Sequence, residues 1–141
     1  MNAAIKISLL ASGLFLLAGM LLGVLKYRRI MTSPKHRAPV YVDTAHRASF
    51  LYSFASLVIA KLLEYSPFST STQVLLAAIP LFYFAVTIVQ YTALGLRNRT
   101  ETQFSQRNFL TTWGMYMLIV GEIGSLSAIL WGFIATQVIG Q

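Results

Sequence analysis

Four long apolar segments constrain the fold of this chain more than any other feature of its sequence. They cover residues 5–25, 45–65, 72–96 and 109–139, and each reaches the roughly 20 residues that a helix needs to cross a hydrocarbon core. Lipid offers the backbone no hydrogen-bond partners, and the sequence lacks the short alternating strands of a barrel, so each segment is expected to be a helix. The sequence therefore predicts an all-α fold, in which residues 1–141 form one integral membrane four-helix bundle.

Composition agrees with a membrane protein and excludes several kinds of site. Of the 141 residues, 56% are hydrophobic and only 11% are charged, which is unlike an ordinary soluble domain. The sequence contains no cysteine, so disulfides, thiolate metal sites and covalent haem attachment are excluded. Phosphate-binding loops, dinucleotide fingerprints and zinc-type clusters are also missing from the sequence. The first segment ends in Lys-Tyr-Arg-Arg without a cleavage pattern, and we expect it to be retained as an anchor.

The distribution of basic residues predicts the orientation. Nine of the eleven Lys and Arg residues lie in or beside the first and third loops: Lys26, Arg28, Arg29, Lys35, Arg37, Arg47, Arg97, Arg99 and Arg107. These two loops share one side of a four-span protein, so they are expected to face the cytoplasm, with both termini outside. The expected location is a bacterial inner (cytoplasmic) membrane. This topology accounts for the net charge of +7, so no nucleic-acid partner is expected. Anionic lipid headgroups are the expected partners of these charges.

Small residues at helical spacing predict where helices approach closely. Gly19 and Gly23 are four residues apart in the first segment, and Gly121, Ser125 and Ala128 form a similar stripe in the fourth. Such stripes let helix backbones pack together in a membrane.

The start of the second segment combines features that could hold a ligand. Asp43 is a typical helix N-cap residue, which would place His46 in the first turn, where the helix dipole favours the neutral, metal-binding imidazole. A stripe of small side chains follows at helical spacing, formed by Ser49, Ser53, Ser56 and Ala60. The stripe leaves room for another helix or for a flat cofactor. His46 is accordingly either a ligand or an ordinary interfacial histidine.

Residues 39–46, Pro-Val-Tyr-Val-Asp-Thr-Ala-His, resemble a motif of the styrene oxide isomerases and hydroxylaminobenzene mutases. In that motif a proline precedes the histidine by seven positions and an alanine precedes it by one, in a short four-span protein. The resemblance implies a haem b held between neighbouring protomers of a homotrimer. It also implies that His46 is the axial ligand of the haem iron, with Ser49 and Ser53 beside the cofactor.

The same resemblance implies the activity. A ferric haem with one axial ligand would act as a Lewis acid on a small apolar substrate, converting an epoxide to a carbonyl compound or catalysing a related mutase reaction. Tyr91 falls at the position of the family's third-helix active-site tyrosine, and Tyr52 is a further candidate for orienting the oxygen or stabilising a cation. The families have Asn-Gly six and seven positions after the histidine, whereas this chain has Tyr52 and Ser53. This departure leaves open an altered substrate orientation or a loss of the chemistry.

Three further polar groups lie inside the apolar segments. Glu122 is near the middle of the fourth segment, where a charge is costly, so it is expected to face the bundle or a protomer interface. Its role is either proton or substrate chemistry or that of a protonated or hydrogen-bonded structural carboxyl, for example with Gln90 or a serine. Lys61 and Glu64 are three residues apart and are expected to form an interfacial ion pair.

Two other classes of function remain open. The chain could be a non-catalytic small subunit or assembly partner of a larger membrane complex. It could also share its layout with the eicosanoid and glutathione membrane enzymes, which are four-span trimers with basic cytoplasmic loops. The arginine, asparagine and glutamate pattern that those enzymes carry on the second helix is missing from this sequence.

Overall fold

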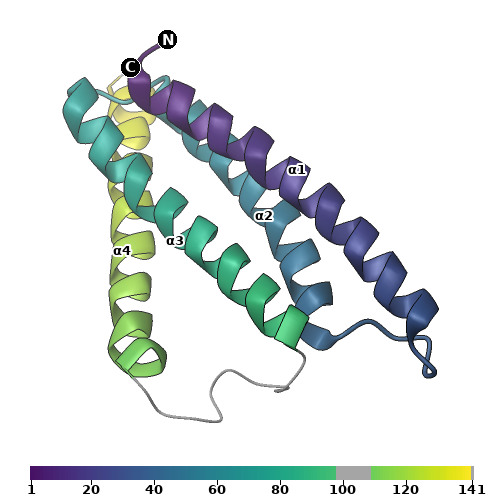
Figure 1. Ribbon diagram of the computed structural model, residues 1–141. Helices are drawn as coiled ribbons and strands as arrows, with labels where there is room; N and C mark the ends of the chain where they lie inside the picture. Colours follow the sequence, from purple (N-terminus) through teal and green to yellow (C-terminus); the bar gives the residue numbers. More distant parts are fainter. Residues whose placement is uncertain (98–108, 141) are drawn as a thin grey trace.

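The computed structural model describes residues 1–97 and 109–140 and contains four long helices, with no strand in that part of the chain (Figure 1). The helices are α1 (Ala3–Thr32), α2 (Val40–Leu63), α3 (Thr70–Arg97) and α4 (Phe109–Ile134), and a π-helical turn, η2 (Ala135–Ile139), continues α4. The predicted all-α class is confirmed. Each predicted apolar segment lies almost wholly within one of these helices.

Three of the helical stretches are long and apolar enough to cross a membrane: Ala3–Thr32, Thr70–Arg97 and Trp113–Ile139. Helix α2 has 24 residues and is about 36 Å long at 1.5 Å per residue, which is sufficient in length. It is less apolar, because serines and charged residues interrupt it. Crossing by α2 therefore stays a prediction.

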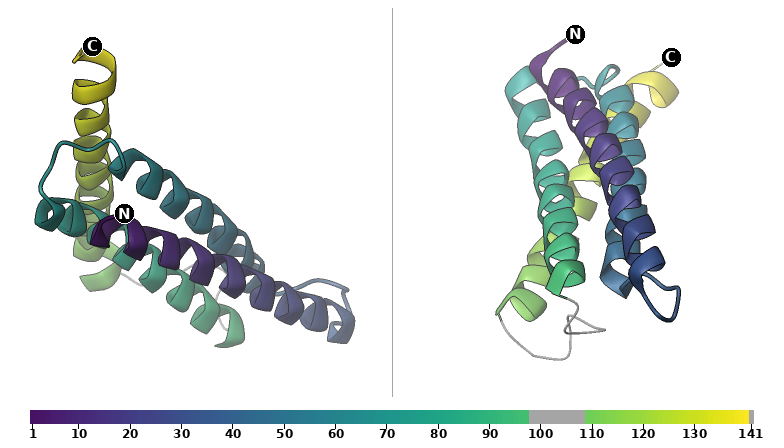
Figure 2. Two further views of the ribbon diagram at one scale, coloured as in Figure 1. Left: turned by 90° about the horizontal axis from the view of Figure 1, so that it is seen from above. Right: turned by 45° about the vertical axis from the view of Figure 1, so that its right-hand side comes forward.

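The helices run between two ends of the molecule (Figure 1). The two termini and the loop between α2 and α3 lie at the opposite end from the loop between α1 and α2 and from the last residue of α3. Helices α1, α2 and α3 lie side by side, and α4 is inclined to them (Figure 2). Each helix runs in the opposite direction to the one before it (Figure 1).

The surface and the interior have the polarity expected of a protein in lipid. Large apolar side chains on the outer face of α1 are more than half exposed, including Leu14 at 54% and Leu21 at 63%. Several of the fully buried side chains are serines, namely Ser8, Ser49 and Ser56, each at 0%. In water this pattern would be unfavourable, whereas in a bilayer small polar residues commonly mediate helix contacts.

Gly19 and Gly23 of α1 face α2, as their spacing predicts. A Cβ atom at Gly19 would lie 3.1 Å from the Phe50 ring, and one at Gly23 would lie 2.9 Å from Cε1 of His46. The absence of a side chain at both positions therefore makes room for two rings of α2. The corresponding stripe on α4 also packs, since a Cβ at Gly121 would lie 3.0 Å from Tyr83 of α3.

The prediction that Asp43 caps α2 is wrong. The helix begins at Val40, after Pro39, and the backbone N–H groups of Val42 and Asp43 both donate to the Pro39 carbonyl. Pro39 has a φ of −53°, so the proline ring already holds the backbone near the value that a helix needs. Asp43 therefore lies within the first turn, and its carboxylate pairs with Lys26 of α1 at 2.5 Å.

Candidate functional site

His46 lies between α1 and α2 and is held there by a hydrogen bond. Its Nδ1 is 2.8 Å from the Gly19 carbonyl oxygen. A carbonyl can only accept, so Nδ1 carries the proton and donates it to Gly19. The Phe50 ring meets the imidazole edge to face, with ring centroids 5.0 Å apart. In the neutral imidazole this bond leaves Nε2 as the acceptor, which is the form that binds a metal.

The early start of α2 changes the reason for expecting a neutral imidazole. His46 is the seventh residue of the helix rather than a first-turn residue, and the effect of the helix dipole falls off beyond the first turn. The hydrogen bond to Gly19 replaces that argument, because a second partner on the other ring nitrogen fixes the tautomer of a ligating histidine.

Helix α1 occupies the room along the serine stripe. The hydroxyl of Ser53 donates to the Ser12 carbonyl at 2.8 Å, and the hydroxyl of Ser12 donates to the Ser53 carbonyl at 2.9 Å. Ser49 is fully buried, and its hydroxyl donates to the Ala45 carbonyl of its own helix at 2.8 Å. Of the two occupants that the sequence left open, another helix fills this stripe within one protomer.

Tyr52 and Tyr91 lie on a different side of α2 from His46. Tyr52 stacks on Phe84 of α3, with centroids 4.3 Å apart and planes inclined by 7°, whereas Tyr91 packs against Tyr41 at 5.7 Å. The two phenols are close enough to interact electrostatically. His46 and Tyr52 are six residues apart, so their side chains leave α2 about 120° apart. The structure therefore brings the two tyrosines together but separates them from the histidine.

Glu122 lies in an apolar hollow between α2, α3 and α4. The hollow has a volume of about 420 Å³ and is lined by Phe54, Ala55, Val58, Ile59, Pro80, Phe84, Glu122, Ile123 and Leu126. The Glu122 residue is partly buried, and its carboxyl interacts electrostatically with Tyr52. The neighbouring Ser125 hydroxyl donates instead to the Gly121 carbonyl, at 2.6 Å. Glu122 thus lines a hollow that α2, α3 and α4 form together, and its role stays a prediction.

The other predicted polar residues lie at the surface of the protein. Gln90 is exposed on α3. The Lys61 ammonium is 2.7 Å from the Glu64 carboxylate, and both side chains are well exposed. The predicted ion pair between these two residues is confirmed.

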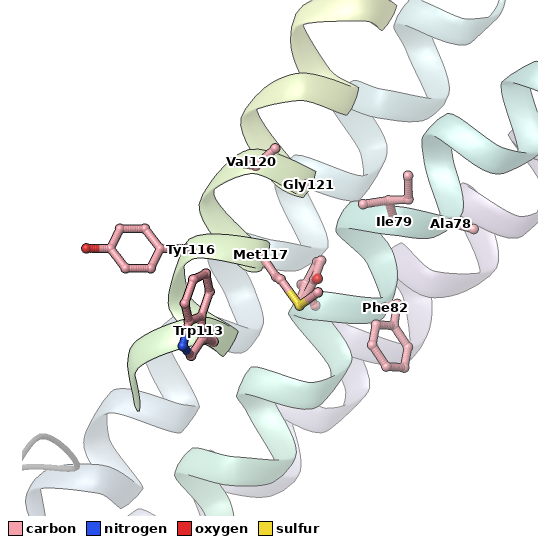
Figure 3. Close-up of a pocket in the computed structure, with 9 residues that line it drawn as sticks. Ala78, Ile79, Phe82, Trp113, Tyr116, Met117, Val120 and Gly121 are labelled. Atoms are coloured by element: carbon pink, nitrogen blue, oxygen red, sulfur yellow. The ribbon is translucent and has the colours of Figure 1, made fainter. Parts of the chain in front are cut away.

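A second apolar hollow, larger than the one around Glu122, was not predicted from the sequence. It lies between α3 and α4, has a volume of about 820 Å³, and is lined by Ala78, Ile79, Phe82, Tyr83, Trp113, Tyr116, Met117, Val120 and Gly121 (Figure 3). Figure 3 shows Met117 directed towards α3, whereas Tyr116 points away from it. The aromatic residues of both segments were visible in the sequence, but the inclination of α4 that opens the hollow was not.

His46 supplies one nitrogen atom that could bind a metal, and the described residues form no larger metal site around it. Within the described residues there is no group of three or more His, Asp or Glu side chains that could hold a metal ion. His46 lines neither of the two hollows. A Cβ at Gly23 would meet the imidazole at Cε1, 2.9 Å away, whereas Nε2 would lie 3.9 Å from it. His46 therefore offers one nitrogen ligand, Nε2, on a partly buried ring that packs against α1.

Comparison with known proteins adds no family assignment. No protein-family model, curated protein or solved structure matches this chain.

Proposed function

We propose that this protein is a haem b-dependent membrane isomerase of the kind that the residue 39–46 motif resembles, with His46 as the axial ligand. The observation that carries the proposal is the 2.8 Å hydrogen bond from Nδ1 of His46 to the Gly19 carbonyl. This bond holds the ring in the ligating tautomer and fixes its orientation. Metal-ligating histidines almost always donate such a hydrogen bond from the ring nitrogen that does not bind the metal. Gly23 supplies the space in which the ring is held.

The proposed topology has four spans, both termini outside, and the basic loops in the cytoplasm of a bacterial inner membrane. The clustering of the first loop and the end of α3 at one end of the molecule supports this topology (Figure 1). His46 would then lie towards the cytoplasmic end of α2.

The proposed site is shared between the protomers of a trimer. Within one protomer, α1 covers the serine stripe, whereas Tyr52 packs against Phe84 of α3 and Tyr91 of α3 packs against Tyr41 of α2, away from His46. A site that uses the histidine and the tyrosines together is therefore assembled from neighbouring protomers. Ser53 supports it indirectly, because its buried hydroxyl donates to the Ser12 carbonyl and fixes α2 against α1, while the buried hydroxyl of Ser49 bonds within α2.

When bound, ferric haem supplies a Lewis acid that weakens a C–O bond of the substrate. The residues of this chain provide the surroundings for that chemistry. His46 holds the group from one side, and a tyrosine hydroxyl orients the substrate oxygen by donating a hydrogen bond. The apolar helices exclude water, which would otherwise capture a developing cation.

An aryl epoxide assay tests this proposal together with the absorption spectrum. The purified protein is expected to convert the epoxide to a carbonyl compound and to show a Soret band. The variant Tyr91→Phe is expected to retain the Soret band but to lose most of the turnover, because it lacks the hydroxyl. A Tyr91→Phe variant with full turnover would remove Tyr91 from the proposed site.

A second candidate function is that of a non-catalytic small subunit, and the hollow between α3 and α4 favours it. This hollow is apolar, measures about 820 Å³, and exposes Trp113 and Tyr116 at its rim. Aromatic residues of this kind are enriched at protein interfaces. A photo-crosslinking residue placed at Trp113 in native membranes distinguishes the two: one crosslinked protein band supports a subunit, and lipid adducts alone exclude it.

A further inference from the structure

The hollow around Glu122 has the composition of a ligand site rather than of plain helix packing. Apolar side chains from three helices form its wall, and two of them are the aromatic residues Phe54 and Phe84. Its volume of about 420 Å³ lies within the range of about 300–1,000 Å³ that is typical of small-molecule sites. Glu122 contributes the one acidic side chain of this lining.

Within the part of the chain that the structure describes, no ion pair involves Glu122. Among the described residues, the ion pairs join Asp43 to Lys26 and Arg47, and Lys61 to Glu64. None of these cations reaches the hollow, and Tyr52 is the titratable group that interacts with the Glu122 carboxyl. A carboxylate at this depth is costly unless a cation or a proton neutralises it. The hollow thus combines one carboxyl group with apolar walls, and its lining contains no basic side chain.

We propose that the Glu122 hollow binds a lipophilic organic cation, in which a positive charge is surrounded by apolar groups. The carboxylate of Glu122 would neutralise the charge, the aliphatic wall would bury the apolar groups, and the rings of Phe54 and Phe84 would provide aromatic surface around them. The cation enters from lipid, since Phe54 is 67% exposed at the edge of the hollow. A hydrophilic cation such as Na⁺ is excluded, because the lining offers only one charged group and few polar atoms to replace its hydration shell.

The cation site does not depend on the proposed haem. Glu122 is on α4 and the hollow is lined by α2, α3 and α4, whereas His46 contacts Gly19 and Gly23 of α1. A His46→Ala variant is therefore expected to keep the cation site, so failure of one proposal does not decide the other.

Binding of tetraphenylphosphonium to the detergent-purified full chain tests the proposal. Tetraphenylborate has the same shape and the opposite charge, and is the matched probe. The wild-type protein is expected to bind the cation, and to bind the anion at least about tenfold more weakly. Glu122→Gln is expected to weaken cation binding by about tenfold or more, because loss of one partner from a desolvated charge pair is costly. Glu64→Gln removes an exposed carboxylate outside the hollow and is expected to bind like the wild type.

A second pair of variants tests the location without changing any charge. Ala55→Leu fills the Glu122 hollow and is expected to weaken cation binding, whereas Ala78→Leu fills part of the larger α3–α4 hollow and is expected to leave it unchanged. This pair also decides the matter if Glu122→Gln fails to fold. Absence of cation binding to the wild type, equal binding of the two probes, or equal cation binding by wild type, Glu122→Gln and Ala55→Leu would overturn the proposal.

Discussion

Substitution of Gly23 by alanine should displace the His46 ring and destabilise the protein. The new Cβ would lie 2.9 Å from Cε1 and 3.3 Å from Nδ1 of His46, which is too close for the ring to stay in place. The ring is tied to Gly19 through Nδ1, so it cannot move away without losing that bond. The variant therefore loses a hydrogen bond worth about 0.5–1.5 kcal/mol and suffers overpacking of about 1–3 kcal/mol.

The same helix provides a matched control. Gly13 has no atom within 4 Å of the position of an added Cβ, so Gly13→Ala meets no obstacle. Alanine is more favourable than glycine within a helix by about 0.5–1 kcal/mol, and this gain applies to both variants. The difference between them is therefore the cost at His46, about 1.5–4.5 kcal/mol in the free energy of unfolding.

Reversible unfolding in mixed detergent micelles, followed by circular dichroism, measures this difference. The double variant Gly23→Ala with His46→Ala should recover most of the overpacking loss, because the ring that the Cβ meets is gone; the pair forms a double-mutant cycle. Equal stability of Gly23→Ala and Gly13→Ala would refute the packing of His46 against α1.

Three further predictions concern the contacts of α2 and the topology. Ser53→Ala should lower the free energy of unfolding by about 1 kcal/mol, since it removes one of two reciprocal hydrogen bonds to α1; an unchanged value in chemical unfolding would contradict it. The hydrogen bond from Lys26 lowers the pKa of Asp43 below its ordinary 3.8 and outweighs the effect of partial burial. The ionised carboxylate therefore stabilises the fold above pH 3.8, and this contribution is lost as the pH falls through the lower pKa of the folded state. Asp43→Asn should therefore be less sensitive to acid than the wild type in pH-dependent unfolding, and equal sensitivity would argue against the pairing. Cysteines at Ser33 and Ser71, at opposite ends of the helices, should react from the cytoplasm and from outside, respectively; the reverse result would invert the topology.

The helices could be predicted from the sequence because lipid solvent leaves the backbone few alternatives. Runs of more than 20 apolar residues must be helical, and the glycine pair at 19 and 23 indicated which face of α1 packs closely. The start of α2 was missed because Asp43 is a typical capping residue, while the proline at position 39 is also compatible with a helix start. The carboxylate of Asp43 instead pairs with Lys26, a contact between two segments that local sequence rules do not include.

The candidate site was predicted only in part, because the sequence shows the residue types but not the directions in which their side chains point. Sequence spacing places His46 and the serines on one side of α2, but two occupants suited that side, and α1 fills it. The side chain of Tyr52 leaves the helix about 120° from His46. The motif compares positions along the sequence and does not show this difference in direction. The hollows around Glu122 and beside Trp113 depend on the inclination of α4, which no local pattern specifies.

The absorption spectrum of the detergent-purified protein, produced with ample haem, tests the central claim most directly. The wild type should show a Soret band, and His46→Ala should lose it while eluting as the same oligomer. His36→Asn is the control, because His36 is exposed in the loop between α1 and α2 at a φ of 48° that asparagine tolerates, and this variant should keep the band. A wild-type protein without a Soret band, or a His46→Ala variant that retains one, would contradict the assignment of His46 as the haem ligand.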